Sequence, residues 1–186
     1  MNYLVFLLEE PSAQAMLEGI LPRLLPPHQF HWQFLVFEGK QDLEKQMEKK
    51  LRGWLLPNSF FIVLRDQDAG DCIRIKQKLV EKCRNAGKPT TLVRIACHEL
   101  ESWFLGDLAA VQKAFNIKKL AEQQRNRKYK EPDKLSNASE ELEKLVKGYR
   151  KVSGAKKIAA YMAIDQNYSH SFNCFISGVN SLVKQS

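Results

Sequence analysis

Apolar runs of strand length alternate with helical patterns through the first half of this chain. The strand-like runs are residues 3–8, 30–36, 60–64 and 91–96. Between them, apolar side chains recur every three or four residues, which is typical of one face of a helix, and Ser12 is expected to cap the first such helix. The alternation predicts an α/β fold with a mainly parallel four-stranded sheet flanked by helices.

Residues 107–186 lack strand signals and are predicted to be helical. Helices are expected over residues 108–115, 139–147, 155–164 and 169–183. Of 29 Lys and Arg and 21 Asp and Glu, residues 1–106 hold 14 and 13, which leaves 15 and 8 for residues 107–186. We therefore expect an α/β domain over residues 1–106 and a basic helical extension packed on it. The basic excess suits contact with a polyanion, although a solvated lysine-rich face would have the same composition.

The cysteines and the apolar segments indicate a cytoplasmic protein without a membrane span. The four cysteines form no Cys-x-x-Cys pair and are expected to be reduced thiols. The apolar run at residues 3–8 is followed directly by two glutamates and lacks the flanks of a signal peptide. No run approaches the roughly 20 apolar residues that a transmembrane helix needs.

Acidic side chains follow three of the four predicted strands. They are Glu9 and Glu10 after the first, Asp66 and Asp68 after the third, and Glu99 and Glu101 after the fourth. Because ligands of open α/β sheets bind outside the carboxyl ends of the strands, these acids are expected to face one crevice. Carboxylates brought together need protons or cations, and hard oxygen ligands select Mg²⁺ or Mn²⁺. A neighbouring Glu could act as general base in a displacement at phosphorus.

Each acid also has a structural alternative. Acids are favoured at helix N-caps and in first turns, and Asp71 could be either a third metal-site acid or the cap of the following helix. Glu101 is the best candidate for an additional metal ligand, but it could instead pair with Arg65 or Arg94 as a structural salt bridge.

Several basic residues are candidates for contacts with nucleic-acid phosphates. They are Lys40, Lys156 and Lys157, and the run Arg125, Arg127, Lys128 and Lys130 in an expected exposed, mobile loop. Tyr129 in that loop could stack on a base. A solvated helix face is an equally good interpretation of Lys156 and Lys157.

The order of these elements resembles the Toprim domain of topoisomerases, primases and overcoming-lysogenization-defect nucleases. That family places a Glu after its first strand and an Asp-x-Asp after its third, around Mg²⁺. The resemblance implies that Glu9 is the catalytic acid or base and that Asp66 and Asp68 are metal ligands. Glu10 stands where the family usually has Gly, so either glutamate could be the functional one.

A wider pattern is similar to an uncharacterised bacterial Toprim-related family of unknown function. The similar segments are residues 9–12, 37–40, 65–72, 94–107 and 169–172. This similarity implies a gene that often neighbours an ATPase in phage-defence settings.

We therefore expect a Mg²⁺- or Mn²⁺-dependent nuclease or related phosphoryl-transfer protein that acts on DNA or RNA, with an ATPase as a possible partner. The alternative is a non-catalytic metal- or nucleic-acid-binding subunit that regulates a partner ATPase. An aspartyl-phosphate phosphatase using Asp66 is disfavoured, because that motif belongs to a first strand and here follows the third.

Overall fold

The computed structural model describes residues 2–25 and 28–184, and its centre is a four-stranded parallel sheet with strand order β2-β1-β3-β4. The strands are β1 (Asn2–Leu8), β2 (Phe30–Val36), β3 (Ser59–Asp66) and β4 (Leu92–Ala96). In the register, Leu8 lies beside both Val36 and Leu64, and Asp66 lies beside Ala96. The carboxyl ends therefore meet at one edge, and the predicted α/β class is confirmed.

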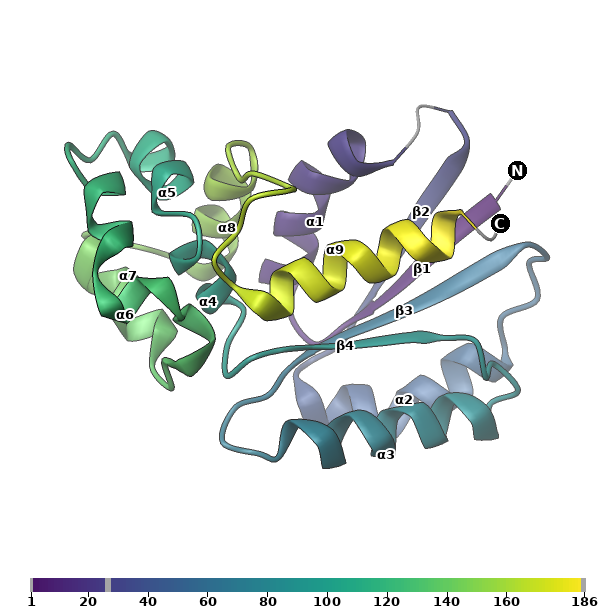
Figure 1. Ribbon diagram of the computed structural model, residues 1–186. Helices are drawn as coiled ribbons and strands as arrows, with labels where there is room; N and C mark the ends of the chain where they lie inside the picture. Colours follow the sequence, from purple (N-terminus) through teal and green to yellow (C-terminus); the bar gives the residue numbers. More distant parts are fainter. Residues whose placement is uncertain (1, 26–27, 185–186) are drawn as a thin grey trace.

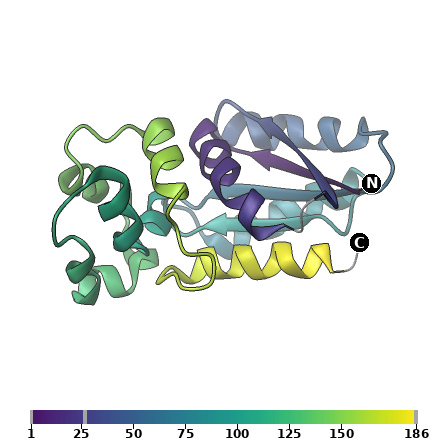
Figure 2. The same cartoon turned by 90° about the horizontal axis from the view of Figure 1, so that it is seen from above.

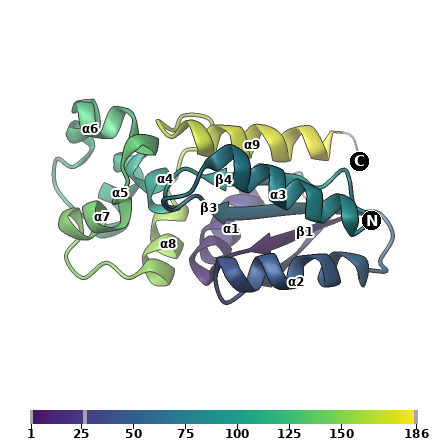
Figure 3. The same cartoon turned by 90° about the horizontal axis from the view of Figure 1, so that it is seen from below.

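Helices cover both faces of the sheet (Figures 1 and 3). The covering helices are α1 (Pro11–Leu24) and α9 (His170–Val183) on one face, and α2 (Lys40–Arg52) and α3 (Cys72–Asn85) on the other. Successive strand residues point to opposite faces, so Phe6 packs in the cluster that contains α1 and α9, whereas Leu7 packs in the cluster that contains α2 and α3. This alternation explains why the central strands β1 and β3 are apolar at nearly every position.

The segment between β4 and α9 forms a helical lobe beyond the carboxyl ends of the strands (Figures 1 and 2). Its elements are α4 (Glu101–Leu105), α5 (Leu108–Phe115), the 3₁₀ helix η1 (Ala121–Arg125), α6 (Arg127–Lys130), the 3₁₀ helix η2 (Pro132–Lys134), α7 (Ala138–Leu145) and α8 (Lys151–Ala159). The lobe shares one hydrophobic cluster with the sheet face under α1 and α9. Close packing joins α8 to α1, since a Cβ on Gly19 would lie 2.8 Å from the Cβ of Ala159.

Local structure differs from the sequence expectations at several places. The expected mobile loop contains the short helix α6, and Tyr129 within it is only 5% exposed. Ser12 lies inside α1, where its hydroxyl donates to the carboxylate of Glu10, so the expected Ser12 cap is wrong. Trp103 is fully buried and packs edge-on against Phe172.

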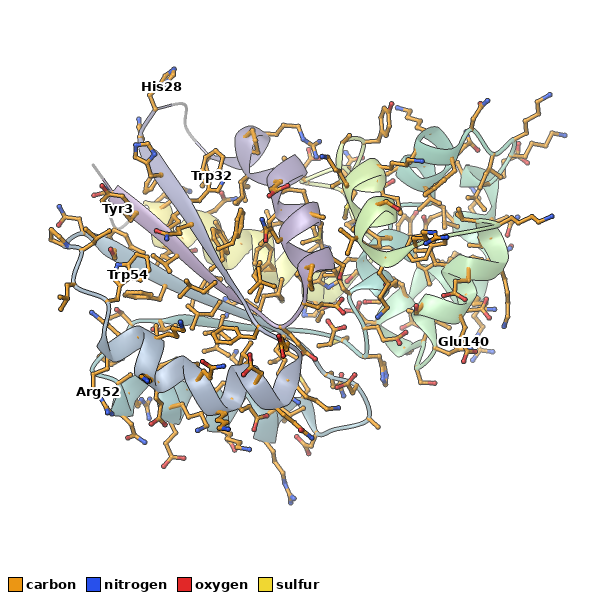
Figure 4. All side chains as sticks on the ribbon, turned by 180° about the vertical axis from the view of Figure 1, so that it is seen from behind. Tyr3, His28, Trp32, Arg52, Trp54 and Glu140 are labelled. Carbon is orange, nitrogen blue, oxygen red and sulfur yellow. The ribbon has the colours of Figure 1, made fainter. Side chains whose placement is uncertain are left out.

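Aromatic side chains mark the opposite end of the sheet. Figure 4 shows Tyr3, Trp32 and Trp54 far from the lobe, which contains the labelled Glu140. Trp54 packs edge-on against Phe61 with ring centroids 6.0 Å apart. Among the described residues, no helix has the length and apolar character needed to cross a bilayer.

Candidate functional site

The loops that follow the strands are tied together by backbone hydrogen bonds at the edge facing the lobe. The N–H of Glu9 donates to the carbonyl of Leu64 (3.3 Å), and the N–H of Gly39 donates to the carbonyl of Glu9 (3.0 Å). On the β4 side, the N–H of Asp68 donates to the carbonyl of His98 (2.7 Å). Asp68 and His98 have φ of 54° and 56°, a left-handed conformation that non-glycine residues adopt rarely. These bonds fix the backbone positions from which the acidic side chains extend.

Glu9 is held by groups of β3. Its Oε2 accepts a hydrogen bond from the N–H of Asp66 (3.1 Å) and lies 3.7 Å from Nε of Arg65, whose Nη1 also donates to Oε1 of Glu44 on α2 (2.7 Å). Burial raises the pKa of Glu9; the hydrogen bond from Asp66 opposes this, and the charge of Asp68 adds to it. A raised pKa makes a carboxyl better suited to proton transfer than an ordinary glutamate.

Three other acids, Glu10, Asp66 and Glu101, form what we call the inner acid cluster. The ammonium of Lys151 lies between two of them, 3.7 Å from Oε2 of Glu10 and 3.9 Å from Oε1 of Glu101. The hydroxyl of Tyr149 donates to the same Oε1 of Glu101 (3.4 Å). Glu101 is 0% exposed, and its Oε2 has no hydrogen-bond partner among the described residues.

Burial and neighbouring carboxylates raise the pKa of two members of the inner acid cluster, Asp66 and Glu101. Burial raises the pKa of Glu101 to about 7, despite the opposing charge of Lys151. Burial also raises the pKa of Asp66 well above its usual value, and the charges of Glu10, Glu9 and Glu101 add to this. Burial alone would lower the pKa of Lys151, but Glu101 and Glu10 outweigh it and the pKa is raised. Such a cluster needs protons or a cation to be stable.

The remaining predicted acids make separate contacts. Asp68 accepts from the ammonium of Lys40 at 2.7 Å, which raises the pKa of Lys40. Asp71 caps α3 by accepting a backbone N–H of its first turn at 2.9 Å, so the structure shows the cap alternative. Glu99 accepts from the N–H of Ser139 (2.7 Å) and thereby ties β4 to α7.

The basic candidates, apart from Lys40, lie on the helical lobe. They are the exposed residues Arg125, Arg127, Lys128 and Lys130 on η1 and α6, and Lys156 and Lys157 on α8. Lys128 is paired with Glu141. Tyr129 packs in the core, so the expectation that it stacks on a base is wrong. Lys156 and Lys157 share α8 with Lys151, which places them on the helix that begins at the inner acid cluster.

The donor atoms suit a hard cation, although their present spacing does not form a metal cage. Within residues 2–25 and 28–184, no three His, Cys, Asp or Glu side chains are grouped so that they could hold a metal ion. Carboxylate oxygens are nevertheless the ligands that Mg²⁺ and Mn²⁺ prefer, and Oε2 of Glu101 is a buried acceptor without a donor. Binding of a metal would therefore require some rearrangement of the cluster.

Sequence reasoning missed Tyr149 and Lys151, because their role depends on contact with acids far away in the chain. The alternative in which Glu101 pairs with Arg65 or Arg94 is not what the structure shows. Arg65 pairs with glutamates of the β1 end and α2, and Arg94 donates to the carbonyl of Cys174 (3.0 Å).

Residues 8–180 match the model of a family described as a domain of unknown function, DUF4276. No curated protein and no solved structure matches the chain.

Proposed function

Because the chain belongs to the DUF4276 family, which has no assigned function, we propose an activity from the candidate site itself. The protein is a Toprim-like, Mg²⁺- or Mn²⁺-dependent nuclease or related phosphoryl-transfer protein that acts on DNA or RNA in the cytoplasm. The observation that carries this proposal is the acidic surroundings of buried Asp66 at the end of β3: its N–H donates to Oε2 of Glu9 (3.1 Å), and burial and the charges of Glu10, Glu9 and Glu101 raise its pKa. Acids at the carboxyl ends of parallel strands favour a cation and a phosphate ligand.

In this proposal, each residue of the site has a separate role in the reaction. A bound divalent cation would stabilise the charge that develops on the transferred phosphoryl group. Asp66 and Asp68 would hold this cation with support from Glu101, and the raised pKa of Glu9 suits it to exchange a proton with the attacking or leaving oxygen. Lys40 lies 2.7 Å from Asp68 and would be free to contact a phosphate if Asp68 held a cation instead. The exposed lysines of the lobe would hold the polymer by its backbone.

The experiment is a cleavage assay on single- and double-stranded DNA and RNA with Mg²⁺ or Mn²⁺. We expect Asp68→Asn to abolish metal-dependent cleavage without changing the unfolding midpoint. Asp165→Asn, at an exposed aspartate of the lobe, is the matched control and should cleave normally. Full cleavage by the Asp68 variant would contradict the proposal.

A second candidate is a non-catalytic subunit that regulates a partner ATPase, as in phage defence. It is favoured by the pairing of Lys40 with Asp68 and of Lys151 with the inner acid cluster, since these contacts neutralise acids without a metal. Copurification with the product of a neighbouring ATPase gene tests it. The absence of both a stable complex and metal-independent binding of nucleic acid would exclude this candidate.

A further inference from the structure

Lys151 holds an unusual position, because one ammonium group lies between two carboxylates that belong to different parts of the chain. Glu10 follows β1, Glu101 begins α4, and Lys151 begins α8. The ammonium is 3.7 Å from one and 3.9 Å from the other. Both distances exceed ordinary hydrogen-bond lengths. The ammonium is thus shared as a charge between the acids rather than bound tightly to either one.

Glu101 supplies the second observation. Its side chain is 0% exposed, and its Oε1 is contacted by Tyr149 and Lys151. Within residues 2–25 and 28–184, Oε2 has no hydrogen-bond partner, and a buried acceptor without a donor is energetically costly. A cation that coordinates both oxygens of Glu101 would remove this cost, and the lysine ammonium does not do so.

We propose that Lys151 stands in for a divalent cation at the inner acid cluster, and that Mg²⁺ or Mn²⁺ binds to Glu10, Asp66 and Glu101 only by displacing it. This inference rests on the proposed function, because it treats the inner acid cluster as part of a metal site. It adds Glu10 to the ligands and makes Lys151 a competitor of the metal.

Displacement of Lys151 would change the charge at the start of α8. A divalent cation and an ammonium group repel each other strongly at distances of about 4 Å inside a protein, so Lys151 must leave when the metal enters. Lys151 is the first residue of α8, which also carries the exposed Lys156 and Lys157. Metal binding therefore frees the ammonium of Lys151 at the start of α8. This adds a third positive charge to the helix whose other two lysines are candidates for phosphate contacts.

The test compares Mn²⁺ affinities of the full chain, measured by electron paramagnetic resonance titration in the absence of nucleic acid. We expect Lys151→Met to bind Mn²⁺ at least tenfold more tightly than the native protein, and Lys151→Arg to stay within about threefold of it. Lys147→Met, at an exposed lysine before α8, is the matched control and should change nothing. Adding Glu10→Gln to the Lys151→Met variant should reverse the gain, whereas adding Glu18→Gln on the exposed side of α1 should not.

The outcomes separate this inference from the proposed function. Equal or weaker binding by the folded Lys151→Met variant would overturn the competition, even if the native protein cleaves nucleic acid. A tighter Lys151→Met variant without any cleavage would support the competition and contradict the nuclease activity. No binding of Mn²⁺ by either protein would overturn both. Because the Lys151 side chain is 46% exposed, the Met variant is expected to fold, and a thermal melt checks this.

Discussion

The buried carboxyl of Glu101 makes the stability of the protein depend on pH in a way that one substitution can isolate. Burial raises its pKa from 4.5 to about 7. A carboxyl whose pKa is higher in the folded protein than in the unfolded chain holds its proton more tightly when folded. Its stabilising contribution is therefore complete below pH 4.5 and is lost as the pH rises through about 7.

The size of this effect follows from the same values. Each pH unit between the two pKa values corresponds to about 1.4 kcal/mol, so the interval from 4.5 to about 7 amounts to roughly 3 kcal/mol. No discount for solvent screening is needed, because the Glu101 side chain is 0% exposed. Glu101→Gln keeps a neutral side chain of the same shape at every pH. It should match the native stability near pH 4.5 and exceed it by roughly 3 kcal/mol at pH 8.

Urea unfolding at intervals between pH 4.5 and 8 measures this difference. The buffers contain a chelator, since a bound divalent cation would favour the ionised carboxylate and mask the effect. Glu18→Gln, at an exposed glutamate of α1, controls for the loss of a carboxyl as such. The reasoning is refuted if the native protein and Glu101→Gln lose the same stability across this pH range.

Three further substitutions test other parts of the structure. Asp71→Ala should cost about 1 kcal/mol in urea unfolding through loss of the α3 cap and leave Mn²⁺ affinity unchanged; weaker Mn²⁺ binding would show that Asp71 is a ligand. Trp103→Ala should cost about 3–5 kcal/mol, because the side chain is fully buried and its Nε1 donates to Ser171 (2.8 Å); a cost below 1 kcal/mol in urea would contradict this packing. Gly106→Ala should lower the thermal unfolding midpoint, since its Cβ would lie 2.0 Å from Oδ1 of Asn167, and an unchanged midpoint would show that the contact relaxes freely.

The sheet could be predicted from the sequence because its central strands, β1 and β3, are buried on both faces. Residues such as Phe6 and Leu7 point to opposite faces and are both 0% exposed, so the run reads as continuously apolar. Three acids of the candidate site could be located for a related reason. Glu9, Asp66 and Glu101 follow or end such runs, and the carboxyl ends of parallel strands meet at one edge.

The cations of the site could not be predicted, because nothing local distinguishes them. Lys151 lies in a lysine- and arginine-rich stretch, and only the packing of α8 against α1 brings it to Glu10. Tyr129 shows the opposite error. Its basic neighbours in the sequence indicated an exposed loop. The Tyr129 ring lies on the buried side of α6, whereas those neighbours are exposed. Composition reports the charge of a segment and not which side chain turns inward.

The position of α9 has a consequence for how the chain acquires its structure during synthesis. The guanidinium of Arg94 on β4 lies under α9, donating to the carbonyl of Cys174 (3.0 Å), and Gly178 makes room for it. All four strands leave the ribosome well before His170–Val183 does. Until that segment emerges, the face of β4 that α9 covers is exposed, and Arg94 lacks its acceptor on α9.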